Sequence, residues 1–171
     1  MKILVLNGSP RNDGNTEAIV DAFAEGAQGA GHEVVIVNVA KKKIAACLGC
    51  EYCHTKGEGQ CIQKDDMAEI YEALTTTDLL VWASPVYYFT FTPQFQAALS
   101  RTYAIGAPEN LSKSALLLTS GSPNVYGAAI EQYKHVNGFW GVEDKGVRTV
   151  FGPNNKSAEA LADAKSFGAS L

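Results

Sequence analysis

Short apolar stretches and amphipathic stretches alternate along the whole chain. The apolar stretches are rich in Val, Ile and Leu and end at Gly, Pro, Ser or Thr, which is typical of buried strands in a parallel sheet. We expect five strands, at residues 2–6, 33–39, 78–84, 115–119 and 146–151. The segments between and after them carry apolar residues at helical spacing, which predicts helices at residues 16–29, 65–74, 93–105, 125–139 and 157–167.

This alternation predicts an α/β fold. Strands that alternate with helices form a parallel sheet whose connections are right-handed crossovers. At 171 residues the simplest organisation is one domain, residues 1–171, with a sizeable core. Ligands of such sheets bind beyond the carboxyl ends of the strands. The loops that follow the strands are therefore the first place to look for function.

The loop after the first strand reads Gly-Ser-Pro-Arg-Asn-Asp-Gly-Asn-Thr and ends where a helix begins. Gly8 and Gly14 allow backbone N–H groups to crowd around an anion. Ser9 and Thr16 add hydroxyl groups, and Arg11 adds a positive charge. The helix N-terminus also favours negative charge. The loop therefore predicts a pocket for one phosphate monoester, with a tight turn that binds nothing as the alternative.

The spacing in this loop excludes better-known phosphate loops. A nucleoside-triphosphate loop has four residues between its glycines and then a lysine. Here five residues separate Gly8 from Gly14, and Asn15 stands at the lysine position. The loop also lacks the G-x-G-x-x-G pattern of dinucleotide-binding folds and the cysteine that a tyrosine-phosphatase loop would need.

Two further loops share the same predicted edge. Ser84-Pro85-Val86-Tyr87-Tyr88 places a rigid proline and two aromatic rings after the third strand. A flat ring system could stack there and accept hydrogen bonds from exposed backbone N–H groups. The same aromatic residues could instead cover a core edge or a subunit contact. Thr119-Ser120-Gly121 follows the fourth strand and would let the backbone approach a ligand closely.

Taken together, these motifs resemble the NADPH-dependent FMN reductase family of flavodoxin-like proteins. The resemblance is carried by Gly8-Ser9-Pro10-Arg11, by Gly14-Asn15-Thr16, and by Ser84 to Tyr88 before a helix that ends near Arg101. It implies a flavodoxin-like three-layer α/β/α sandwich with a five-stranded parallel sheet in the order 2-1-3-4-5. It also implies non-covalently bound FMN and a homodimer or homotetramer. The implied phosphate ligands are Ser9, Arg11, Asn15 and Thr16, and the implied neighbours of the isoalloxazine are Pro85, Val86, Tyr87, Tyr88 and Gly121.

All four cysteines lie in the connection between residues 40 and 64. They form a C-x2-C-x2-C-x7-C pattern, made by Cys47, Cys50, Cys53 and Cys61. The first three have iron–sulfur ligand spacing, and the whole resembles the compact motif of the iron–sulfur flavoproteins, although the last gap is long. A [4Fe–4S] cluster is one interpretation. Structural zinc, thiols that form a disulfide on oxidation, and ordinary loop cysteines are the others.

Composition narrows the class of protein. The formal net charge of −4 provides no basic footprint for nucleic acid. No apolar stretch approaches the length of a membrane span. The first residues form a predicted strand and do not have a signal-peptide layout, so we expect a cytoplasmic protein.

The leading hypothesis is an NAD(P)H-dependent FMN oxidoreductase. Reduced nicotinamide would pass hydride to flavin N5, and the flavin would then reduce a quinone, a free flavin or a small electrophile. Because the cofactor carries this chemistry, we predict no catalytic acid or base among the protein residues. One alternative is an electron-transfer iron–sulfur flavoprotein that serves protein partners. Another is a non-catalytic sensor that binds FMN or reports thiol oxidation.

Overall fold

A computed structural model describes residues 1–171. Its strands are β1 (Lys2–Asn7), β2 (Glu33–Asn38), β3 (Leu79–Pro85), β4 (Lys113–Ser120) and β5 (Glu143–Phe151). Its α-helices are α1 (Asn15–Gly29), α2 (Tyr52–Thr55), α3 (Met67–Thr75), α4 (Pro93–Arg101), α5 (Gly127–Trp140) and α6 (Ala158–Ala169). Three short 3-10 helices complete the chain: η1 (Val39–Lys41), η2 (Thr102–Ala104) and η3 (Gly152–Lys156).

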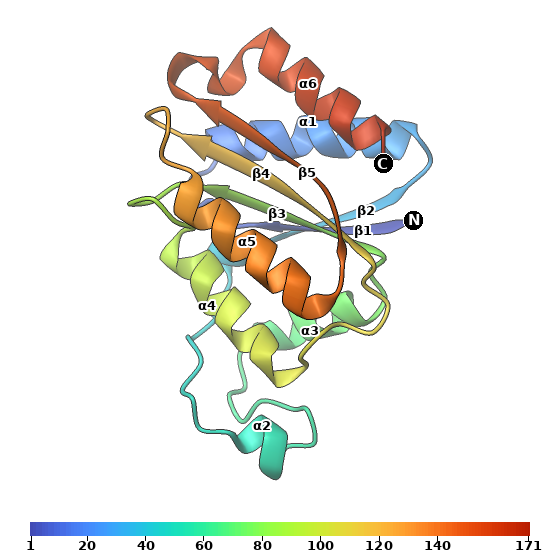
Figure 1. Ribbon diagram of the computed structural model, residues 1–171, viewed down its shortest axis with the longest axis vertical. Coiled ribbons are helices and arrows are strands. Elements are labelled where there is room, and N and C mark those ends of the chain that lie inside the picture. Colours follow the sequence, from blue (N-terminus) through green and yellow to red (C-terminus); the bar gives the residue numbers. More distant parts are fainter.

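All neighbouring strands pair in parallel, in the order β2-β1-β3-β4-β5, which confirms the predicted sheet. The pairing also aligns the ends of the strands. Asn7 lies opposite both Asn38 and Ala83, and Pro85 lies opposite Thr119. The carboxyl ends of all five strands therefore meet at one edge of the sheet, on the left in Figure 1.

Helices cover both faces of the sheet. Side chains alternate along each strand, so Ile3 and Val5 pack with α1 and α6, while Leu4 and Leu6 pack with α3, α4 and α5. Figure 1 shows the resulting layers, with α1 and α6 above the strands and the other three helices below them. No helix combines the length and the apolarity that crossing a membrane requires.

The predicted boundaries differ from the observed ones at two places. The fifth strand begins at Glu143 instead of residue 146, because Glu143 and Asp144 already pair with Lys113 and Ser114, ahead of a register shift between Ser114 and Leu116. The fourth helix ends at Arg101, and its predicted last turn is instead the 3-10 helix η2. Arg101 therefore marks the end of α4.

The cysteine-rich connection leaves the layered body. We call residues 42–66, between η1 and α3, the cysteine loop. It contains the four-residue helix α2, which the sequence pattern did not predict. Figure 1 shows this loop projecting below α4, away from the carboxyl edge of the sheet.

Candidate functional site

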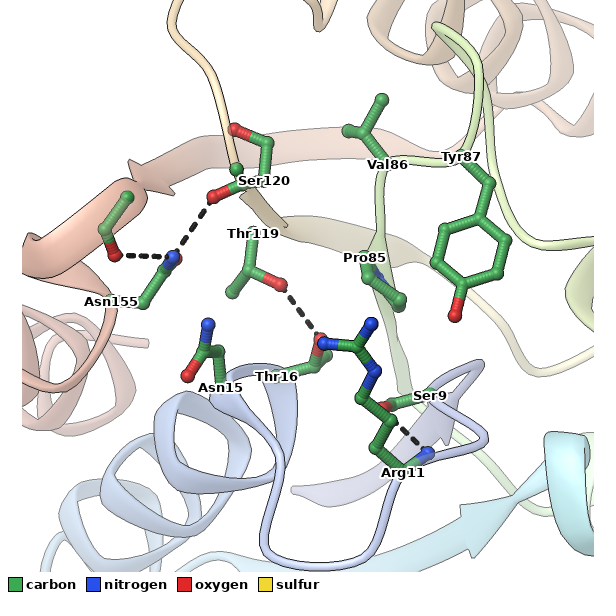
Figure 2. Close-up of a pocket in the computed structure, with 12 residues that line it drawn as sticks. Ser9, Arg11, Asn15, Thr16, Pro85, Val86, Tyr87, Thr119, Ser120 and Asn155 are labelled. Atoms are coloured by element: carbon green, nitrogen blue, oxygen red, sulfur yellow. Dashed lines mark hydrogen bonds between the residues drawn. The ribbon is translucent and has the colours of Figure 1, made fainter.

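A cavity of about 290 Å³ opens beyond the carboxyl ends of the strands. It is lined by three loops that the sequence singled out and by a fourth that follows β5 (Figure 2). Eight of the nine residues expected to contact the cofactor line it: Ser9, Arg11, Asn15, Thr16, Pro85, Val86, Tyr87 and Gly121. The structure thus brings together side chains from three separate parts of the sequence.

The first loop is held in shape by its own hydrogen bonds. The Ser9 N–H donates to Asn7 Oδ1 at 2.9 Å, and Asn38 Nδ2 donates to the Ser9 carbonyl at 3.2 Å. The Arg11 N–H donates to Ser9 Oγ at 3.4 Å. The Arg11 guanidinium takes part in none of the ion pairs of the protein. It therefore remains available for a ligand.

The N-terminus of α1 faces the same cavity. Its cap residue, Gly14, has extended backbone and contributes no side-chain cap. The first N–H groups of the helix consequently have no intrahelical acceptor, and the helix dipole adds partial positive charge. Arg11 is the only charged residue in the cavity wall. The site therefore combines one unpaired cation with unused N–H donors, which suits an anion such as phosphate.

Gly8 has a different role from the one expected of it. Its N–H donates to the Ala83 carbonyl at 2.7 Å, so this group is not free to bind an anion. A Cβ atom at Gly8 would lie 2.9 Å from Phe95 Cβ. Thr92, at the N-terminus of α4, donates its hydroxyl to the Gly8 carbonyl at 2.8 Å. Glycine is thus required here because α4 packs directly against the loop.

The third loop is tied to the first. Thr16 Oγ1 and Thr119 Oγ1, both buried, share a hydrogen bond of 2.8 Å. Ser120 Oγ is bonded to Tyr126 Oη at 2.7 Å, which fixes the loop against α5. The Val86 N–H donates to the Thr119 carbonyl at 2.7 Å and connects the second loop to the third. These bonds make the cavity a preformed feature of the sheet edge.

Tyr88 is the predicted site residue that the structure places outside the cavity. Its side chain is 95% exposed, whereas Tyr87 contributes to the wall. Tyr87 and Thr90 close a tight turn through two backbone hydrogen bonds, of 2.9 and 3.2 Å. The two residues inside the turn, Tyr88 and Phe89, have φ values of 46° and 71°. A turn of this kind points both of their side chains away from the pocket.

The backbone donors of the second loop are also fewer than expected. The Val86 N–H is bonded to Thr119, and the Tyr87 N–H is bonded to Thr90. A ring lying against this loop would therefore meet N–H groups that are already paired. The expectation of exposed N–H donors fails at these two positions because the turn and the neighbouring strand use them.

The sequence interpretation missed the fourth loop of the site. Gly152 and Asn155, both in η3, line the cavity together with Thr119 and Ser120. Asn155 is buried and its Nδ2 donates to the carbonyls of Ser120 and Gly152, at 2.9 and 2.8 Å (Figure 2). The signal was present, because η3 follows the fifth predicted strand and every loop at that edge can contact a ligand.

The four cysteines line a second, separate cavity of about 20 Å³. Cys47 and Cys50 are exposed, Cys53 is buried and Cys61 lies between these extremes. No three His, Cys, Asp or Glu side chains converge as a ligand set for one metal ion. Burial raises the pKa of the Cys53 thiol, and the negative charges of Cys61 and Glu51 act in the same direction.

Comparison with known proteins gives both sites a context. The family model for NADPH-dependent FMN reductase matches residues 1–147. An iron–sulfur flavoprotein of Archaeoglobus fulgidus is 33% identical, and the match covers 100% of this chain and 79% of that protein. For the relatives that follow it, the matched part spans about half to two thirds of their length.

Two further similarities cover nearly the full length of both partners. A Bacillus subtilis protein, whose name places it among NAD(P)H-dependent FMN-containing oxidoreductases, is 26% identical over 99% of this chain and 94% of its own. The solved structure of an NAD(P)H:quinone oxidoreductase from Methanothermobacter marburgensis superposes with a TM-score of 0.76 at 19% identity, covering 100% of this chain and 96% of the other. At that identity the second likeness concerns the fold.

Proposed function

The chain belongs to the NADPH-dependent FMN reductase family, whose members are oxidoreductases, and on that premise we propose that its sheet-edge cavity binds FMN. We further propose that NAD(P)H reduces the bound cofactor, which then passes electrons to a quinone, a free flavin or another small electrophile. The observation that carries this proposal is the cavity itself, which joins an anion site to an apolar wall.

The anion site fits the FMN phosphate. A monoester dianion needs several donors and little more than one neutralising charge. Ser9, Thr16 and Asn15 supply polar side chains, the first turn of α1 supplies N–H groups, and Arg11 supplies the charge. No carboxylate lines the cavity to repel the anion.

The opposite wall fits the flat part of the cofactor. Pro85, Val86 and Tyr87 present rigid apolar and aromatic surface, and Gly121 leaves room for close approach across from them. A volume of about 290 Å³ lies just below the usual range for ligand pockets, which is about 300–1,000 Å³. Such a cavity encloses part of FMN and leaves another part open to a nicotinamide or an acceptor.

When bound, FMN supplies the hydride-accepting and electron-donating chemistry. The residues of this chain bind and orient it. Thr16 and Thr119 hold the first and third loops together, and Asn155 fixes the edge of the third. The cavity wall contains no carboxylate, histidine, lysine or cysteine, so we assign no acid or base to the protein.

Anaerobic stopped-flow mixing of the FMN-loaded protein with NADH or NADPH tests the reductase proposal. We expect at least one of the two to bleach the flavin absorbance before any acceptor is added. Subsequent mixing with a quinone, with free FMN or with a small electrophile identifies the acceptor class. Failure of both nicotinamides to bleach the flavin would remove the reductase function and favour electron transfer from a protein partner.

The cysteine loop supports a second candidate function, an iron–sulfur flavoprotein that transfers electrons. The observation that favours this candidate is that all four cysteines of the chain line one cavity. The donor set of four cysteines is the one that [4Fe–4S] clusters use, and Cys47, Cys50, Cys53 and Cys61 would hold such a cluster. The cluster would supply single-electron chemistry.

Iron and acid-labile sulfide analysis of anaerobically purified protein tests this candidate. We expect about four iron atoms per chain for a [4Fe–4S] cluster. If the protein holds fewer than about one iron per chain even after anaerobic reconstitution, the cluster is excluded. The cysteines would then be thiols that form a disulfide on oxidation, or ordinary loop thiols. The FMN proposal does not depend on the result, because the two cavities share no residue.

A further inference from the structure

Arg101 is the most deeply buried charged side chain of the protein, with an exposure of 1%. It ends α4 and lines the cysteine cavity. Its Nη1 and Nη2 donate to the two carboxylate oxygens of Asp65, at 2.7 and 3.2 Å. A bidentate pair of this kind is geometrically specific as well as strong. The placement of a cation beside four thiols calls for a physical explanation.

The remaining side-chain hydrogen bonds of Arg101 go to the backbone on both sides of the cysteines. Nη1 donates to the carbonyl of Ala45, two residues before Cys47, at 3.0 Å. Nη2 donates to the carbonyl of Gln63, two residues after Cys61, at 3.4 Å. Asp65 accepts from the Ala45 N–H at 3.1 Å. One guanidinium thus joins the incoming and outgoing arms of the cysteine loop to each other and to α4.

We propose that Arg101 is a positioning residue that closes the base of the cysteine loop and so keeps all four cysteines around one cavity. Lys43 and Asp66 join the outer ends of the same arms through two hydrogen bonds, of 2.7 and 3.1 Å. Beyond the arms, the Tyr103 hydroxyl donates to the Glu51 carboxylate at 3.0 Å, and two further contacts anchor the loop. The Cys47 N–H donates to Ser100 Oγ at 3.2 Å, and a ring nitrogen of His54 lies 2.9 Å from the Tyr103 carbonyl. These anchors lie on α4 and η2, next to Arg101 in the sequence.

The role is geometric and not one of activating the thiols. Desolvation alone would lower the pKa of Arg101, but its bonds to Asp65 outweigh that effect and raise it. Asp65 pairs directly with the guanidinium and compensates its charge at the base of the loop. What Arg101 contributes is a planar fork that reaches four oxygens at once.

Three variants separate this role from simple charge pairing. Arg101→Lys keeps the charge beside Asp65, but a single ammonium cannot reproduce the fork. Asp65→Asn combined with Arg101→Met removes both charges together, which avoids leaving one of them buried without a partner. Arg148→Lys is the matched control, since Arg148 is also ion-paired, with Asp163, and lies on β5. FMN binding and the thermal midpoint report whether each variant is folded.

The first readout needs no metal. In reduced, metal-free protein, mass spectrometry follows the alkylation of each cysteine by iodoacetamide under native conditions. We expect Cys53 to react about tenfold faster in Arg101→Lys and in the double variant than in the wild type, because the loop opens locally without unfolding the body. The Arg148→Lys control should leave the Cys53 rate unchanged. An unchanged Cys53 rate in both Arg101 variants would overturn the proposal.

The second readout rests on the proposed iron–sulfur function. After anaerobic reconstitution, we expect both Arg101 variants to hold less iron and sulfide per chain than the wild type and to lose the electron paramagnetic resonance signal of the reduced cluster. Equal iron content and an identical signal in wild type and Arg101→Lys would contradict the positioning role. A wild type that takes up no iron would defeat only the cluster proposal, because Cys53 protection still tests Arg101.

Discussion

The FMN cavity and the cysteine loop differ in how their geometry is determined. The cavity is built from the ends of strands and the start of a helix, and hydrogen bonds such as Thr16–Thr119 join its loops. The cysteine loop leaves the layered body and depends on Arg101 and a few neighbouring contacts. The shape of a site at a sheet edge is determined by the fold, whereas a site on a projecting loop needs a specific residue to hold the loop in place.

Removing the cysteine loop should show the largest effect. Because the carbonyls of Ala45 and Gln63 both contact one guanidinium, a short Gly-Ser-Gly segment can replace residues 46–62. We expect complete loss of iron binding, while the dissociation constant for FMN changes by no more than about threefold, since distant sites contribute independently. Fluorescence titration with FMN checks this. A tenfold loss of FMN affinity would show that the two regions are coupled.

Arg11→Ala tests the charge of the FMN cavity. A hydrogen bond to a charged group contributes about 1.5–3 kcal/mol, so we expect FMN binding to weaken roughly 10- to 100-fold without a change in thermal stability. Lys134→Ala, which removes an exposed positive charge from α5, should have no effect on binding. Equal affinities for the Arg11 and Lys134 variants would place the phosphate elsewhere.

Acidification should loosen the cysteine loop before it affects the cavity. Burial alone would raise the pKa of Asp65, but the hydrogen bond from Arg101 and those from the N–H groups of Ala45 and Met67 lower it below 3.8. A carboxylate with a lowered pKa stabilises the folded form above its unfolded-state value, and this contribution is lost as pH falls below about 4. Pepsin cleavage within residues 46–62 should therefore increase over that range.

The Asp65→Asn variant provides the comparison for this pH dependence. It cannot titrate at residue 65, so its cleavage within the loop, measured at each pH relative to that of an unfolded reference protein, should already be fast at pH 5 and should change little on further acidification. Wild-type cleavage that is independent of pH, or that begins in the layered body, would contradict the assignment of Asp65 to the loop.

The smallest effect is expected at the turn beside the cavity. Tyr88 and Phe89 both adopt left-handed backbone, which costs of order 1 kcal/mol or more for residues of this type. Replacing them with Asn and Gly, the preferred pair for such a turn, should stabilise the protein by about 1 kcal/mol in urea unfolding. FMN affinity should remain within about threefold, because neither side chain lines the cavity.

The same variant also tests the predicted contact between subunits. Tyr88 is 95% and Phe89 54% exposed, as expected if the strained turn serves a partner surface. Sedimentation velocity should show a homodimer or homotetramer in the wild type and a smaller species in the variant. A large loss of FMN affinity instead would restore Tyr88 to the cofactor site.

The sequence predicted the parts of this protein that periodic patterns encode. The Val- and Leu-rich strands and the helices between them predicted a parallel α/β sheet, the family resemblance implied its order, and the carboxyl-edge rule located Ser9, Pro85 and Gly121 around one cavity. The same rule applied to β5 would have added Asn155. The geometry of the turn could not be predicted from the sequence, because Tyr88 and Phe89 are not residue types that favour left-handed backbone.

The cysteine loop was less predictable for a physical reason. Its shape depends on contacts between residues far apart in the sequence, such as Arg101 with Ala45, 56 residues away. Such a pair has no periodic signature, and an arginine at the end of a helix ordinarily indicates an exposed cation near the dipole. Only the three-dimensional structure shows that this one is buried between the two arms of the loop.

The central claim is that the first loop binds the phosphate of FMN. Its most direct test is the affinity of the wild-type protein for FMN compared with riboflavin, which has the same ring and ribityl chain but no phosphate. We expect FMN to bind at least about 100-fold more tightly, since riboflavin lacks the phosphate that accepts several charge-assisted hydrogen bonds. Equal dissociation constants for the two flavins would contradict the account, because the cradle formed by Ser9, Arg11 and the start of α1 would then have no ligand to hold.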